Sequence, residues 1–151
     1  MVKKLIKQVF KDNERIALLS CPSLYQTISS IADNVLLFEF DEKFSKYEKD
    51  FVFYDYNLGQ DENYLKEYAD SFDLIILDPP FLSEDCLRKS LLIVNRIKKE
   101  KSLIVLNTGT IQKELAREHG LIESKFKPQH KNNLANQFST FSNFDIDNFL
   151  E

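Results

Sequence analysis

The sequence predicts an α/β fold: a doubly wound, mostly parallel sheet with an antiparallel pair of strands at its C-terminal edge. Short apolar runs alternate with segments of helical periodicity along most of the 151 residues. The runs are apolar at successive positions, as in strands that are buried on both faces. The last two strand candidates are joined by a basic loop without a helix, which favours antiparallel pairing. We expect residues 1–151 to form one domain, because this length suits a single hydrophobic core.

Five buried strands are expected before that final pair. Each is an apolar run that ends in a polar or acidic turn. They cover residues 15–20, 35–40, 51–54, 74–77 and 103–106. A short amphipathic helix over residues 5–10 precedes the first strand.

Helices are expected between the strands, where apolar residues recur at helical spacing. Pro22 and Ser23 suit the first turn of one helix. Asp61 is a candidate cap for another. The apolar face of that second helix would consist of Tyr64, Leu65, Tyr68 and Ala69.

The longest helix is expected directly after Ser83, a candidate N-cap. Glu84 and Asp85 complement its positive end, and a group of lysines complements its negative end. The lysines are Lys98, Lys99 and Lys101. A shorter helix from Ile111 is expected to stop at Gly120, since glycine favours the left-handed residue that follows many helices.

The last two strands are expected over residues 121–126 and 137–144. The loop near and between them is basic, and two interpretations stay open: it contacts a substrate, or it is a solvated connection. Its basic residues are Lys125, Lys127, His130 and Lys131.

Composition narrows the function classes. The net charge of −4 argues against broad electrostatic attachment to nucleic acid. No apolar run approaches the length of a membrane span, and the N-terminus lacks a signal-peptide pattern. Cys21 and Cys86 are far apart without metal-ligand spacing, so we expect reduced thiols, a cytoplasmic protein and no metal site.

The ends of the first three strands meet at one predicted edge of the sheet. The residues there are Ser20, Pro22, Glu39, Asp41, Asp55 and Tyr56. A carboxylate after the second strand can accept hydrogen bonds from ribose hydroxyls, and Asp55 is placed to accept from an adenine amine. The first turn has no glycine fingerprint, so NAD and FAD are not expected, whereas an adenosyl group without phosphates fits. Each carboxylate taken alone could also be a solvated loop residue.

Asp78-Pro79-Pro80-Phe81 follows the fourth strand and precedes the longest helix. The prolines have no N–H, so this corner offers oxygen acceptors without local donors. Acceptors beside an aromatic ring suit an amine nucleophile that must be oriented through its N–H groups. The structural alternative is a proline-stiffened exit from a buried strand, with Phe81 returning into the core.

This tetrapeptide resembles the [DNS]-P-P-[YFW] motif of amine-directed methyltransferases that depend on S-adenosylmethionine. Residues 78–89 are similar to one branch in particular, the lysine methyltransferases of translation elongation factor 1-alpha. That branch was first described as adenine methylases. The resemblance runs from about Arg15 to Phe144 and includes residues 38–41, 51–57 and 128–138.

The resemblance implies a Rossmann-like methyltransferase sheet, S-adenosylmethionine as cofactor, and a cytoplasmic, monomeric enzyme that acts on elongation factor 1-alpha. It assigns catalysis to Asp78, Pro79, Pro80 and Phe81. It assigns the cofactor to Ser20, Pro22, Glu39, Asp41, Asp55, Tyr56 and Asp78. Members of the branch also carry an N-terminal extension with a Q-F-W-Y motif, which residues 1–151 lack.

Two alternatives stay open at this point. One is an adenine-amine methyltransferase on DNA or RNA, which would flip its target base against Phe81. An acidic single domain shows no broad phosphate-binding surface for that task. The other is a cofactor-binding remnant without activity.

Overall fold

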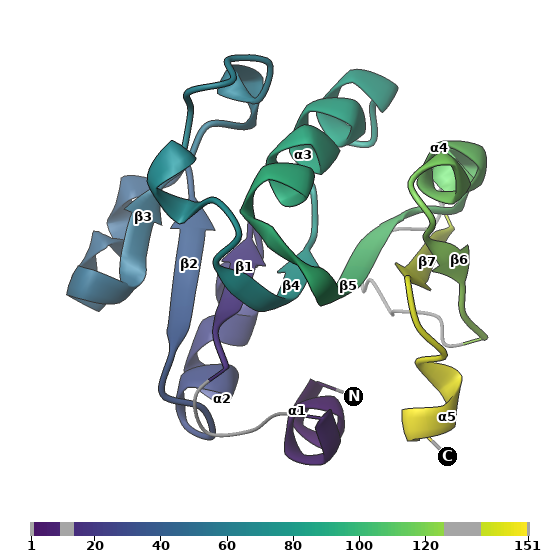
Figure 1. Cartoon of the computed structure of the whole chain (residues 1–151), viewed down its shortest axis with the longest axis horizontal. Helices are drawn as coiled ribbons and strands as arrows, with labels where there is room; N and C mark the ends of the chain where they lie inside the picture. Colours follow the sequence, from purple (N-terminus) through teal and green to yellow (C-terminus); the bar gives the residue numbers. More distant parts are fainter. Residues whose placement is uncertain (1, 10–13, 126–136, 151) are drawn as a thin grey trace.

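The computed structural model describes residues 2–9, 14–125 and 137–150. Predictions for Phe126 and for Lys127, His130 and Lys131 of the basic loop lie outside the described residues, as does most of the string over residues 128–138. Figure 1 shows a central sheet with helices on both sides.

Within the described ranges, seven strands form one sheet in the order β3-β2-β1-β4-β5-β7-β6. Strands β1 to β5 are parallel, and β7 runs antiparallel to both β5 and β6. The strands are β1 (Ile16–Leu19), β2 (Val35–Glu39), β3 (Phe51–Phe53), β4 (Phe72–Leu77), β5 (Lys98–Gly109), β6 (Ile122–Glu123) and β7 (Phe138–Ser142). The predicted fold class, including the antiparallel C-terminal edge, is confirmed.

Helices flank the sheet on both faces (Figure 1). The α-helices are α1 (Val2–Val9), α2 (Tyr25–Ser29), α3 (Glu84–Ile97), α4 (Lys113–Glu118) and α5 (Asp147–Leu150). The 3₁₀-helices are η1 (Pro22–Leu24), η2 (Glu42–Asp50), η3 (Tyr56–Leu58), η4 (Lys66–Tyr68) and η5 (Thr110–Gln112). Within the described residues, no helix is long and apolar enough to cross a membrane.

Residues 74–77 of strand β4 are apolar at every position, and the packing of the sheet shows why. Ile75 and Leu77 pack into one core cluster with residues of α3 and α4. Leu74 and Ile76 pack into a second cluster with residues of α1 and α2 on the other face. All four side chains are fully buried, so no polar residue is tolerated between them.

The helix predicted after Asp61 is wrong. Turns and the short η4 replace it, and Leu65 adopts a left-handed backbone with φ 58°. Arg96 of α3 donates from Nη1 to the carbonyl of Tyr64 at 2.9 Å and from Nη2 to the carbonyl of Gly59 at 3.0 Å. The Tyr64 carbonyl, which a regular helix would bond internally, is thus satisfied by a long-range bond that sequence periodicity cannot reveal.

Two further boundaries differ from the predictions. Helix α3 is capped as expected, since the Ser83 hydroxyl accepts from the Cys86 N–H at 3.1 Å, but it ends at Ile97. The following lysines begin β5, where Lys99 pairs with Asp73 at 3.0 Å. The strand predicted over residues 121–126 is shorter in the structure, where β6 covers Ile122–Glu123.

Candidate functional site

The carboxyl ends of the parallel strands are aligned at one edge of the sheet. Leu19 of β1 is in register with Leu77 on one side and with Phe38 on the other. The Asp78 N–H donates to the Leu19 carbonyl at 3.1 Å, and the Ser20 N–H donates to the Phe38 carbonyl at 2.9 Å. The hydrogen bonding between the strands therefore continues to the first polar residue after β1 and after β4. This fixes the points at which Ser20 and Asp78 leave the sheet.

A cavity of about 280 Å³ opens at this edge. Its size is close to the lower end of the range of about 300–1,000 Å³ for small-molecule sites. It is lined by Ser20, Glu39, Phe40, Asp41, Tyr54, Asp55, Tyr56, Asn57, Pro80 and Phe81. Seven of the residues predicted as site residues are thus brought together: Ser20, Glu39, Asp41, Asp55, Tyr56, Pro80 and Phe81. Pro22, Asp78 and Pro79 do not line it.

The three carboxylates of the cavity are oriented by turn amides. Glu39 Oε2 accepts from the Asp41 N–H at 2.6 Å, and Asp41 Oδ1 accepts from the Lys43 N–H at 3.0 Å. Asp55 Oδ1 accepts from the Asn57 N–H at 2.9 Å, which caps η3. The carboxylates are consequently part of rigid turns.

The first turn contains an unusual backbone conformation. Ser20 has φ 60°, in the left-handed region that favours glycine. Strained residues of this kind concentrate at functional sites. The chain then turns through Cys21 into η1, with Pro22 in the first turn of that helix, as predicted.

The thiol of the buried Cys21 is influenced by the charges of two predicted site carboxylates. Its thiol donates to the Ile76 carbonyl at 3.4 Å. Burial raises the pKa of this thiol well above its usual 9.0, and the charges of Asp78 and Glu39 raise it further. Asp78 itself is half-buried.

Phe81 does not return into the core. Its side chain is 61% exposed, and its ring centroid lies 6.2 Å from that of Tyr56, which follows β3. Pro79 is buried and Pro80 is exposed. The part of the structural alternative that returns Phe81 to the core is wrong, because the ring is exposed and lines the cavity.

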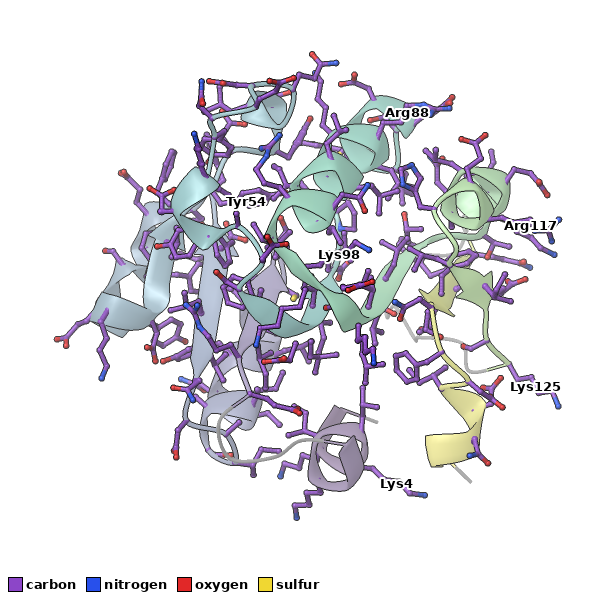
Figure 2. The ribbon with its side chains drawn as sticks, in the orientation of Figure 1. Lys4, Tyr54, Arg88, Lys98, Arg117 and Lys125 are labelled. Carbon is purple, nitrogen blue, oxygen red and sulfur yellow. The ribbon has the colours of Figure 1, made fainter. Side chains whose placement is uncertain are left out.

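Three lining residues were not predicted: Phe40, Tyr54 and Asn57. Phe40 is 62% exposed and lies 5.5 Å, ring to ring, from Phe53. The sequence signal that could have identified Phe40 is its position between two acidic residues, Glu39 and Asp41. Tyr54 is almost fully buried in the core cluster on the α3 side and is labelled in Figure 2.

The turn that carries Asp55 and Tyr56 is attached to α3. Besides the two bonds from Arg96, Gly59 packs so closely that a Cβ atom there would lie 2.6 Å from the Lys89 carbonyl. The Asp55 N–H also donates to the Tyr64 hydroxyl at 2.8 Å. One wall of the cavity is thereby held by contacts remote from it in sequence.

The sheet order and the cavity at the strand ends define the chain as having the fold of methyltransferases that depend on S-adenosylmethionine. A TehB-like methyltransferase of this class from Corynebacterium glutamicum has a TM-score of 0.65 and 20% identity, covering 92% of this chain and 84% of its own. Another from Aquifex aeolicus has a TM-score of 0.60 and 14% identity, covering 93% and 87%.

The chain belongs to the family described as probable N6-adenine methyltransferase, whose model matches residues 1–146. A protein-lysine N-methyltransferase of Drosophila melanogaster is 40% identical, covering 100% of this chain and 70% of that protein. EEF1A lysine methyltransferase 1 of Danio rerio is 41% identical, covering 96% and 89%. The human protein of that name is 42% identical, covering 87% of this chain and 62% of its own length. The chain thus spans less than two thirds of the human relative, and the resemblance stated from the motifs is confirmed.

Proposed function

We propose that this protein transfers a methyl group from S-adenosylmethionine to the ε-amine of a lysine in translation elongation factor 1-alpha. Relatives at 40–42% identity are named as protein-lysine or EEF1A lysine methyltransferases. The free thiols of Cys21 and Cys86 fit a cytoplasmic setting for this activity. We also propose that it acts as a monomer.

The cavity residues fit an adenosyl group. Glu39 and Asp41 offer carboxylate oxygens to ribose hydroxyls, and Asp55 offers one to the adenine amine. The exposed ring of Phe40 supplies a flat apolar surface between them. Ser20 and Tyr56 also line the cavity, and Pro22 and Asp78, which do not line it, would lie next to the bound group. When bound, S-adenosylmethionine would supply a methyl group attached to a positively charged sulfur. The leaving group of the transfer is the neutral thioether, which is a good one.

The protein's task is then to align the amine and keep it unprotonated. A lysine ammonium has a pKa of about 10.4 in water. Transfer into an apolar slot beside Phe81 lowers that pKa, since burial disfavours the charged form. The carbonyls of Asp78 and Pro79 and the Asp78 carboxylate can accept hydrogen bonds from the amine and orient its lone pair. Phe81 packs on the lysine stem, and its face attracts a partly methylated cationic head.

The exposure of Phe81 at the cavity is the observation that carries this assignment. Phe is among the residue types most often fully buried, and Phe81 follows closely after the buried end of β4. The Phe81 ring is 61% exposed at the edge of the cavity, where an incoming side chain can reach it. Pro80 and Phe81 thus join the cofactor cavity to the exterior.

The experiment combines binding with transfer. Isothermal calorimetry with S-adenosylmethionine and S-adenosylhomocysteine measures cofactor affinity, and transfer of a radiolabelled methyl group is followed with elongation factor 1-alpha, DNA and RNA as acceptors. We expect label in the protein acceptor and its loss, by about a hundredfold or more, in Asp78→Ala. Label in nucleic acid instead would favour an adenine methyltransferase, as the family description suggests. Cofactor binding without any transfer would favour the inactive remnant.

A further inference from the structure

The corner formed by residues 78–81 is held at both ends by hydrogen bonds to other elements. Pro79 and Pro80 have no N–H, so the corner cannot bond through its own amides. At its start, the Asp78 N–H donates to the Leu19 carbonyl of β1 at 3.1 Å. At its end, the Leu82 carbonyl accepts from Gln112 Nε2 at 2.8 Å. The second bond comes from a side chain that follows β5, on the opposite side of the corner from β1.

Gln112 is a buried amide that this bond satisfies. Its side chain is 8% exposed, and it is one of few polar side chains in the described interior. A buried amide group costs free energy unless it is paired, so an apolar residue of similar shape would serve packing alone at least as well. We therefore infer that the amide of Gln112 has a role in addition to packing.

The element that carries Gln112 is itself fixed to the sheet. In η5, the Thr110 N–H donates to the Gln137 carbonyl at 2.9 Å. The Thr110 and Ser139 hydroxyls are 2.6 Å apart, and Ser139 also donates to Glu123 at 2.6 Å. These contacts join η5 to β6 and β7, so Gln112 connects the corner to a rigid support.

Packing brings the same segments together next to this bond. A Cβ atom built on Gly109 would lie 3.4 Å from Leu82 Cδ2 and 3.6 Å from Ile111 Cγ2. The end of β5 and the residue after the corner are thus in close contact. A change in the Gln112 bond would alter the position of Leu82 and, through one peptide unit, that of Phe81.

We propose that Gln112 is a positioning residue for methyl transfer, which fixes the exit of the Asp78–Phe81 corner through the Leu82 carbonyl. The inference rests on the proposed function and extends it to a residue outside the motif. Gln112 does not line the cofactor cavity. Its loss should therefore impair alignment of the amine while leaving cofactor affinity intact.

The test compares Gln112→Met, which keeps the volume and removes the donor, with the matched control Gln60→Met. Gln60 is exposed and does not line the cavity. We measure kcat and KM for transfer to elongation factor 1-alpha, and the Kd of S-adenosylmethionine by calorimetry. For Gln112→Met we expect kcat to fall about tenfold or more, because small misplacements of reacting groups are costly, with the cofactor Kd unchanged. The control should match the wild type in both.

Gln112→Glu gives a pH signature that a purely structural role would not produce. Its carboxyl group can donate to the Leu82 carbonyl only when protonated. We divide the kcat of each variant by the wild-type kcat at the same pH. This ratio should be higher for Gln112→Glu than for Gln112→Met at the lowest pH tested. The kcat of Gln112→Met relative to the wild type should not vary with pH.

Three results would overturn the inference. One is an unchanged kcat in a folded Gln112→Met, and another is an equal loss of kcat and cofactor affinity. The third is a Gln112→Glu variant no better than Gln112→Met at low pH. A wild-type chain that transfers no methyl group overturns the proposed function and this inference with it, whereas the three results above, with an active wild type, overturn this inference alone.

Discussion

The ring of Phe81 lies 6.2 Å from the ring of Tyr56, so the exit of β4 meets the turn after β3 across the cavity mouth. The two residues are far apart in sequence and are separated in the sheet by β1 and β2. Their contact joins the proposed amine-binding corner to the proposed cofactor wall. A methyl donor bound against one and an acceptor packed on the other would meet at this point.

Phe81→Ala is expected to reduce kcat/KM for elongation factor 1-alpha by about tenfold to a hundredfold, since the lysine stem loses its aromatic wall. Stability should change by less than about 1 kcal/mol, because the ring is mostly exposed. Methyl-transfer kinetics and urea unfolding measure the two effects. Ile122→Ala is the matched control, because Ile122 is also 61% exposed but lies on β6. Equal activity in both variants would contradict the role of Phe81.

Glu39→Gln is expected to weaken S-adenosylmethionine binding by about tenfold to a hundredfold, the usual value of a hydrogen bond to a charged group. The amide keeps the shape of the carboxylate but loses its charge. Calorimetry gives the Kd directly. Glu62→Gln, an exposed acid that does not line the cavity, should bind like the wild type. An unchanged Kd for Glu39→Gln would remove Glu39 from the cofactor site.

Arg96→Met is expected to destabilise the fold by about 1–3 kcal/mol, because the carbonyls of Gly59 and Tyr64 both lose a charged donor. Cofactor affinity should fall as well, since the same turn carries Asp55. Urea unfolding and calorimetry give the two values. Arg88→Met is the control: Arg88, labelled in Figure 2, forms exposed ion pairs with Glu84 and with Glu118 of α4, and its replacement should leave both values unchanged. Intact cofactor binding in a destabilised Arg96→Met would show that the turn does not depend on this support.

Stability should decline at alkaline pH partly because of Cys21. Burial raises the pKa of its thiol in the folded state well above 9.0, so only the unfolded chain ionises near that pH. A raised folded pKa contributes stability that is fully present below the unfolded pKa and is lost as the pH rises through the folded pKa. Urea unfolding at about pH 7 and about pH 10 should show a smaller decline in Cys21→Ala than in the wild type. An identical decline in both would show that Cys21 ionises normally in the folded protein.

Local signals predicted most of the sheet and part of the site. The apolar runs identified the parallel strands, because burial on both faces leaves little room for polar residues. The Ser83 cap and the stop at Gly120 were also correct, since these conformations depend on neighbouring residues alone. The prediction of a helix after Asp61 was wrong because this segment is bonded by Arg96, which belongs to another element.

By itself, the sequence determined which strands form, that their polar ends share one edge, and that the chain is a methyltransferase relative. These properties follow from periodicity, turn chemistry and motif strings, which are local. Only the tertiary structure decided that Phe81 projects outward against Tyr56, that Phe40 joins the cavity wall, and that Gln112 bonds the Leu82 carbonyl. Each depends on how distant segments pack, and the packing of a side chain is set by neighbours that the linear order does not specify.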